Sequence, residues 1–141
     1  MALSGARKTS QATSSVPNLL METAPVKGGT TIYKGGITAI SSAGYAIPGE
    51  TAVGINVIGM ALDTVANSGA DGAQRIRVAR GVFKYKNSGS SDVIGWSEVG
   101  KNCYLVDDET VAKTSGTATR SVAGIVDSVA ADGGVWVRIG V

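Results

Sequence analysis

The run most suggestive of chemistry lies between residues 95 and 102. Gly95, Gly100 and Lys101 have the spacing of a P-loop, in which backbone N–H groups and a lysine hold phosphate oxygens. Asn102 stands where that motif carries a magnesium-binding Ser or Thr. A P-loop also precedes a helix, whereas the residues after Lys101 have the pattern of a strand. The run therefore favours a structural turn, with Trp96 packed beneath it, over a nucleotide site.

Carboxylates offer a second kind of chemistry, because their oxygens bind hard cations. Asp107, Asp108 and Glu109 are consecutive, but the spacing and the turn glycine of an EF-hand are missing. We interpret them as the solvated tip of a hairpin. Asp127 and Asp132 flank another turn, and nothing in the sequence places a glycosidase pair there. We expect no metal site.

Composition removes most nucleophilic catalysis. The chain has one Cys and no His, which excludes Ser-His-Asp and Cys-His arrangements, the usual zinc sites and intrachain disulfides. Cys103 alternates with apolar residues, a pattern typical of a small buried side chain. We therefore expect a protein that is not an enzyme, with no catalytic residues and no cofactor.

Positive charge gathers on one predicted strand, residues 74–86. Its basic residues are Arg75, Arg77, Arg80, Lys84 and Lys86, with no acid among them. The large apolar residues change parity after residue 80, which predicts a β-bulge at Gly81. With such a bulge the charges would share one face as a basic stripe. A solvated outer face, an acidic protein partner and nucleic acid all fit a stripe; nucleic acid fits least, because Phe83 and Tyr85 are needed in the core rather than for base stacking.

The composition is typical of one small all-β domain. The 141 residues are 43% hydrophobic and include 20 glycines, which favours short strands and tight turns. The net charge of +2 is too small to indicate a partner. No apolar run has the length of a signal peptide or a membrane helix, so we expect a protein made and kept in the cytoplasm, without a membrane partner.

Short apolar or alternating runs predict the strands. They are residues 30–33, 36–40, 45–47, 52–65, 74–86, 102–106, 110–113, 121–129 and 135–141. The acidic residues 107–109 and the glycines after Asp132 provide the turns of two hairpins. The expected fold is a small β-barrel or sandwich of short antiparallel strands over residues 26–141.

Residues 1–25 are expected to form an extended N-terminal arm. Residues 2–15 are small and polar and bury too little apolar surface to offset the entropy of ordering, so we expect them to be mobile in the isolated protein. Val16, Leu19, Leu20 and Met21 supply an apolar anchor. This anchor either closes the base of its own barrel or docks on a neighbouring subunit.

A series of short motifs follows in a distinctive order. They are KGGTTIYKGG at 27–36, GYAIP at 44–48, IGMA at 58–61, GVF at 81–83, Trp96 ahead of Gly100, YLVD at 104–107, AGIV at 123–126 and the closing strand at 135–141. In this order and spacing they resemble the capsid cement, or decoration, proteins of tailed bacteriophages over residues 26–141. The chain departs from the shorter members in residues 1–25 and in Met60, where Val is common.

The resemblance implies a structural role, in which the protein binds the outside of a capsid and stabilises contacts between major capsid subunits. Its partners would be the major capsid protein and itself, as a homotrimer or a dimer, at the virion exterior after assembly in the host cytoplasm. No direct contact with nucleic acid and no catalytic residues are implied. The candidate contact residues are Val16, Leu19, Leu20, Met21, Arg75, Arg77 and Arg80.

Two other functions fit the same pattern. A head-tail or tail-tube subunit would expose long hydrogen-bonding strand edges for ring assembly. An OB-like module for single-stranded nucleic acid would expose aromatic side chains on its strand faces.

Overall fold

The computed structural model of the chain describes residues 2–11 and 19–141. Its strands are β1 (Leu19–Leu20), β2 (Ala24–Pro25), β3 (Thr30–Ile32), β4 (Ile37–Ile40), β5 (Ala46–Pro48), β6 (Asn56–Ala61), β7 (Val65–Asn67), β8 (Arg75–Ile76), β9 (Val78–Asn87), β10 (Asn102–Leu105), β11 (Thr110–Ala112), β12 (Val122–Val129) and β13 (Val135–Ile139). Two short 3-10 turns, η1 (Ser90–Asp92) and η2 (Trp96–Glu98), lie between β9 and β10. The all-β expectation is confirmed.

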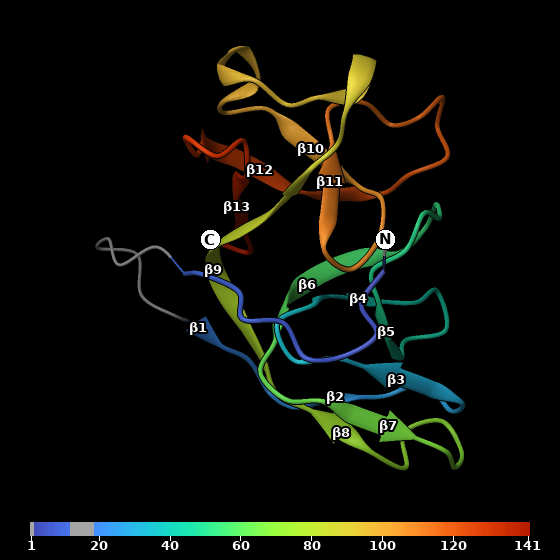
Figure 1. Cartoon of the computed structure of the whole chain (residues 1–141). Helices are drawn as coiled ribbons and strands as arrows, with labels where there is room; N and C mark the ends of the chain where they lie inside the picture. The colour runs from blue at the N-terminus through green and yellow to red at the C-terminus, as the bar shows by residue number, and fades with distance from the viewer. Residues whose placement is uncertain (1, 12–18) are drawn as a thin grey trace.

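Five strands close into a barrel in the upper part of Figure 1. Their order is β9-β13-β12-β10-β11, each antiparallel to the next. A parallel pairing of β11 with β9, with Thr110 opposite Lys86, completes the ring. Closure leaves these strands few free edges on which another chain could add a strand.

The remaining strands lie below the barrel in Figure 1. β6, β4 and β5 continue the sheet from β9, beginning where Met60 pairs with Ala79. The strand pairs β2–β8 and β3–β7 form two small separate sheets. Ala24 of β2 is buried and pairs with Ile76 of β8.

β9 and the preceding β8 serve two hydrophobic clusters. Phe83 and Tyr85 belong to the barrel cluster, whereas Ile76 and Val78 belong to a second cluster below it. Successive side chains of a strand point to opposite faces, so a straight strand can supply one cluster with even-numbered residues and the other with odd-numbered ones. The change of apolar parity in the sequence marks the passage from one core to the other.

The β-bulge expected at Gly81 is therefore wrong. Gly81 pairs with Ile139 in a register that continues without a shift to the pairing of Tyr85 with Val135. Gly81 is also absent from the residues with positive φ. Arg75 lies in β8 and Arg77 between β8 and β9, beside the second cluster, whereas Arg80, Lys84 and Lys86 lie on β9, so the basic residues do not share one strand.

Residues 2–11 run along the barrel, and we call them the strap. The Lys84 N–H donates to the Ser10 carbonyl (3.0 Å), and Gln11 forms a bridge with Phe83, whose other side pairs with Val137. β9 pairs with β6 at residues 78–79 and with β11 at residues 86–87. The strap thus supplies main-chain partners to the stretch of β9 between these two pairings.

The expectation that residues 2–15 are mobile is wrong for residues 2–11. The Arg7 N–H donates to the Lys34 carbonyl (2.6 Å), and the Thr9 hydroxyl donates to the Gly35 carbonyl (2.6 Å). Main-chain and polar side-chain contacts hold this segment, so its low apolar content did not predict its behaviour. Residues 12–18, including Val16, lie outside the described residues.

Candidate interaction surfaces

The predicted contact residues Arg75 and Arg77 lie beside the second cluster, and each has a local partner. Arg77 donates from Nε and Nη2 to the two carboxylate oxygens of Asp63 (2.9 and 2.7 Å), and this hydrogen bonding lowers the pKa of Asp63. Arg75 Nε donates to the Thr23 hydroxyl (2.9 Å). The exposed Arg77–Asp63 pair adds little stability. It does neutralise a charge that the sequence analysis left free for a partner.

Arg80, the third predicted arginine, lies against the end of the last strand. A Cβ at Gly140 would come within 2.7 Å of Arg80 Cδ, so glycine leaves room for this side chain. Leu19 and Leu20 pair with Arg80 and Ala79 of β9, and Met21 packs against the second cluster. The described part of the apolar anchor thus lies on its own chain.

Two of the three carboxylates at the β10–β11 turn are buried. We call residues 107–109 the carboxylate tip; Asp108 and Glu109 are only 2% and 7% exposed. The Leu3 N–H donates to Asp108 Oδ1 (2.8 Å). Glu109 Oε1 lies 3.1 Å from Lys86 Nζ and 3.7 Å from Arg7 Nε. The expected solvated tip is wrong, because the strap and β9 cover it.

Titration of this region reflects its burial. Burial raises the pKa of Asp108, opposed by the hydrogen bond from the Leu3 N–H. Burial also raises the pKa of Tyr85, whose hydroxyl donates to the Gly35 carbonyl (3.1 Å) and whose ring centre lies 5.0 Å from the Arg7 guanidinium carbon. The carboxylate tip anchors the strap, and its acids are not grouped to hold a metal.

The P-loop-like run forms the turn η2 instead of a helix. The Gly95 N–H, which would face a phosphate in a P-loop, donates to Glu98 Oε1 (2.8 Å). A hydrogen bond from the Ser97 hydroxyl, together with this one from Gly95, lowers the pKa of Glu98. The site is thus occupied by the chain's own anion, in agreement with a structural turn.

Cys103 is fully buried, as its pattern predicted. Burial raises the pKa of its thiol to about 12, so the reactive thiolate does not form near neutral pH. Within the residues that the structure describes, no group of three or more His, Cys, Asp or Glu side chains could hold a metal ion. The same part of the chain contains no helix long and apolar enough to cross a membrane.

The largest departure from the sequence analysis is the segment 88–101, which we call the apolar loop. Trp96 is 66% exposed, and Val93 and Val99, three residues to either side, are 47% and 37% exposed. The expectation that Trp96 packs beneath the turn is wrong. Large apolar side chains that share one exposed segment are typical of a surface that binds another protein, where Trp is the residue most often dominant.

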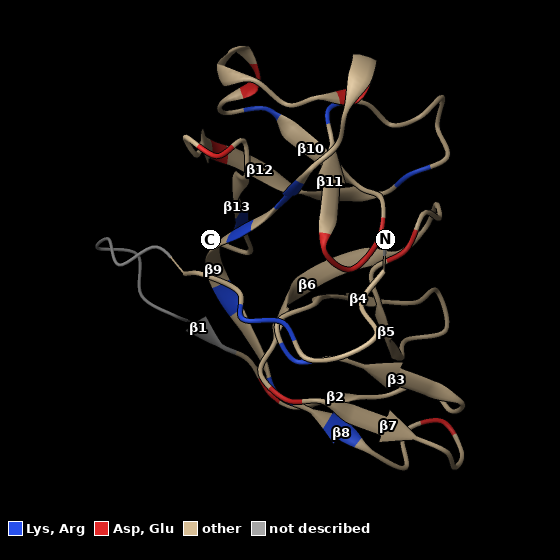
Figure 2. Ribbon diagram, viewed as in Figure 1, with Lys and Arg blue, Asp and Glu red and all other residues tan. Residues whose placement is uncertain are grey.

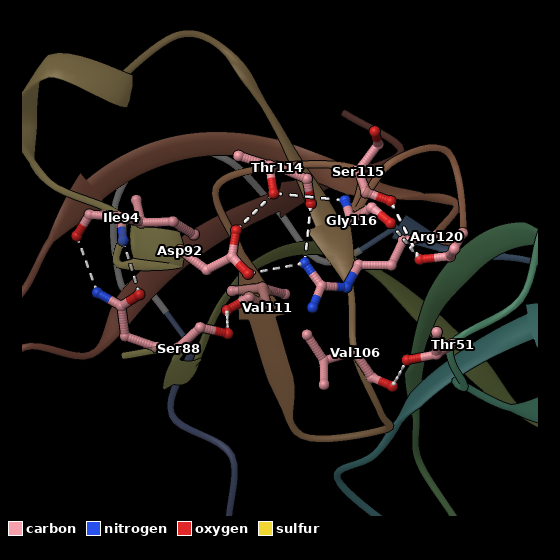
Figure 3. Close-up of polar contacts among 12 residues, drawn as sticks. Thr51, Ser88, Asp92, Ile94, Val106, Val111, Thr114, Ser115, Gly116 and Arg120 are labelled. Carbon is pink, nitrogen blue, oxygen red and sulfur yellow. Dashed lines mark hydrogen bonds and ion pairs between the residues drawn. The ribbon is translucent and has the colours of Figure 1, made fainter. Parts of the chain in front are cut away.

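A polar network fixes the apolar loop to the end of the barrel (Figure 3). The Asp92 carboxylate accepts hydrogen bonds from the Thr114 hydroxyl and from Arg120 Nη1 (3.2 Å), and these bonds lower its pKa. The Lys113 N–H donates to the Asp92 carbonyl (2.9 Å). Asp92 immediately precedes Val93, so the network sets the position of the first exposed valine.

A second set of contacts holds the next residue of the loop. The Asn87 side chain accepts a hydrogen bond from the Ile94 N–H (2.9 Å) and donates to the Ile94 carbonyl (2.8 Å). The Ile94 side chain is buried in the barrel cluster, and the Ser88 hydroxyl donates to the Val111 carbonyl (2.9 Å). Because the loop is anchored on both sides of Val93, the backbone at this exposed residue is fixed before any partner binds.

Comparison with protein-family models, with curated proteins and with solved structures finds no match for this chain.

Proposed function

We propose that the protein is a structural virion protein that binds the outer surface of a phage capsid and stabilises contacts between major capsid subunits. The exposed Trp96 on an anchored loop carries the proposal, because such a side chain is what a protein presents to a protein surface. The motifs over residues 26–141 resemble those of cement proteins and supply the identity of that surface. The same resemblance implies that the protein also binds further copies of itself, as a homotrimer or a dimer.

The fold favours this function over a ring-forming head-tail or tail-tube subunit. Such subunits assemble through long free strand edges. Here β11 closes the barrel on β9, and the strap pairs with β9 at residues 83–84. Both contacts cover edges that a ring subunit would offer.

The side chains also favour a protein partner over single-stranded nucleic acid. Phe83 and Tyr85 are 0% and 1% exposed, so the central strand offers no aromatic face for base stacking. The exposed aromatic side chain in the described part of the molecule, Trp96, lies in a loop.

The test is co-sedimentation with undecorated capsids assembled from the major capsid protein of the same genome. Trp96→Ser is expected to bind about tenfold or more weakly, because a central tryptophan commonly dominates an interface. Val53→Ser is the matched control, since Val53 is 63% exposed and lies outside the apolar loop. It is expected to bind like the parent.

Circular dichroism of each variant checks that the fold is retained. Equal binding of Trp96→Ser and the parent would remove the apolar loop from the contact. Failure of the parent to bind capsids would contradict the proposed function itself.

A further inference from the structure

A basic groove of about 670 Å³ runs between the strap, β9 and the β12–β13 turn. Arg7 and Lys8 of the strap and Lys84 and Lys86 of β9 line it. Figure 2 shows Lys and Arg positions on β9 and on the strap beside it. These cations come from segments about 80 residues apart in sequence, so the groove exists only in the folded chain.

Positive charge exceeds negative charge in the basic groove. Asp132 lies on its wall and pairs with Lys84 (2.6 Å), and Glu109 lies behind it and pairs with Lys86 (3.1 Å) and Arg7 (3.7 Å). Lys8 is exposed and has no ion-pair partner among the described residues. Four cations thus face two carboxylates, and the Lys86 side chain is 59% exposed. The groove is suited to an anionic ligand.

The spacing of the lysines selects the kind of anion. Lys84 and Lys86 are two residues apart on one face of β9, so they repeat at roughly 7 Å along the strand. An extended peptide repeats its own same-face side chains at the same distance. Carboxylates at alternate positions of such a peptide can therefore each meet one lysine.

Two further features favour a peptide. Val93 lines the basic groove and is 47% exposed, which offers an apolar contact to a flanking side chain. Tyr85 also lines the groove, but it is 1% exposed and presents no face for a nucleic-acid base.

We propose that the basic groove binds an extended protein segment with acidic side chains at alternate positions and an apolar residue at one end. The identity of the partner rests on the proposed function, which makes it a segment of the major capsid protein. Val93 belongs to both the groove and the apolar loop, so one partner surface can contact the two together.

The experiment measures fluorescence anisotropy of labelled peptides with the full-length protein. The probe is Ser-Glu-Ser-Glu-Ser-Glu-Ser-Val, compared with a Gln version and with a version in which the three Glu are consecutive. The alternating Glu peptide is expected to bind about tenfold more tightly than the Gln peptide at low salt, and less tightly as salt is raised. Binding is expected to weaken about tenfold in Lys84→Gln/Lys86→Gln.

Lys101→Gln/Lys113→Gln is the matched control, because both lysines are exposed and neither lines the groove. Equal weakening in this control, or equal binding of the Gln peptide, would overturn the proposal. Equal binding of the consecutive Glu peptide would overturn the alternating geometry. Stronger binding of an oligothymidylate of the same length would assign the groove to nucleic acid instead.

The two proposals fail separately. If the protein binds the peptide but does not sediment with capsids, the proposal for the basic groove is supported and the proposed capsid function is contradicted. If the protein binds capsids through Trp96 but does not bind the peptides, the proposed function is supported and the proposal for the basic groove is contradicted.

Discussion

Two loops at the barrel invert the usual placement of side chains. The apolar loop holds Trp96 and two valines in solvent, whereas the carboxylate tip holds Asp108 and Glu109 inside. In each loop the burial of the side chains differs from what their residue types predict, because residues elsewhere in the chain contact the loop. Asp92 and Asn87 fix the backbone of the apolar loop, and the strap covers the carboxylate tip with Arg7 and the Leu3 N–H.

The difference shows which of the two loops serves the fold. A buried carboxylate needs a cation or donors, and the carboxylate tip finds them in the strap and in β9, so its contacts join these segments of the domain. An exposed tryptophan gains nothing in the isolated domain. We infer that the carboxylate tip is structural and that the apolar loop is free for a partner.

The largest expected effect concerns the passage of the strap over Gly35. Gly35 has φ +89°, and a Cβ there would collide with the Arg7 carbonyl. Gly35→Ala is expected to cost about 3 kcal/mol of unfolding free energy in urea denaturation, because it adds a clash to the positive-φ strain. Gly44→Ala is the control: φ is +91° but no atom lies within 4 Å of the added Cβ, so the expected cost is about 1 kcal/mol.

Equal costs for the two glycine variants would show that the strap does not press on Gly35. The carboxylate tip would then lack the cover on which its structural role depends.

The next effect is local to the apolar loop. Asp92→Ala removes the acceptor shared by Thr114 and Arg120, so the loop is expected to open more often. Trypsin cleavage at Lys101 should become about tenfold faster, since proteolysis follows the population of the open form. Asp63→Ala also removes a carboxylate paired with an arginine, but outside the loop, and should leave this rate unchanged. Unchanged cleavage in Asp92→Ala would mean that the network does not hold the loop.

The smallest effect is a pH dependence at the carboxylate tip. The folded pKa of Asp108 lies above the ordinary value of 3.8 for an aspartate side chain, so the folded chain holds this proton more tightly than the unfolded chain does. The associated stability is present below pH 3.8 and is lost as the pH rises through the folded pKa. Asp108→Asn keeps an acceptor for the Leu3 N–H and removes the charge. It should be more stable than the parent at pH 7 by less than about 1 kcal/mol.

Asp63→Asn is expected to change the pH dependence of stability in the opposite direction. Arg77 lowers the pKa of Asp63, so its stabilisation is present above pH 3.8 and is lost as the pH falls through the folded pKa. Urea denaturation across the acid range measures both variants. Parallel pH profiles for the parent and Asp108→Asn would mean that Asp108 has the same pKa in the folded and unfolded chains, which would contradict the expected effect of burial.

The longer strands were predictable because their signal is local, whereas the two-residue strands β1 and β2 and most of β7 were not predicted. The run 102–106 is observed as Asn102–Leu105, and the ambiguous run 52–65 contains β6 at Asn56–Ala61. Alternation of apolar residues and turn glycines such as Gly133, with φ +91°, is enough to locate such elements. The burial of Cys103 followed from the same alternation.

The binding surfaces were less predictable, because they combine distant segments. Arg75 and Arg77 were expected to share a stripe with Arg80, but they precede β9, which carries Arg80, and Asp63 pairs with Arg77. One feature of the sequence could have indicated that Trp96 is exposed: it lies between glycines, in a run where apolar and polar residues do not alternate. That signal equally fitted a residue packed beneath the turn.

The sequence by itself determined that this is an all-β chain with most of its longer strands and with no His-dependent chemistry, because residue types and short-range periodicity carry that information. Only the tertiary structure decided that the strap covers the carboxylate tip, that β9 serves two cores and that four cations line one groove. These features depend on which distant segments become neighbours when the barrel closes, and side-chain burial and charge pairing take their values only then.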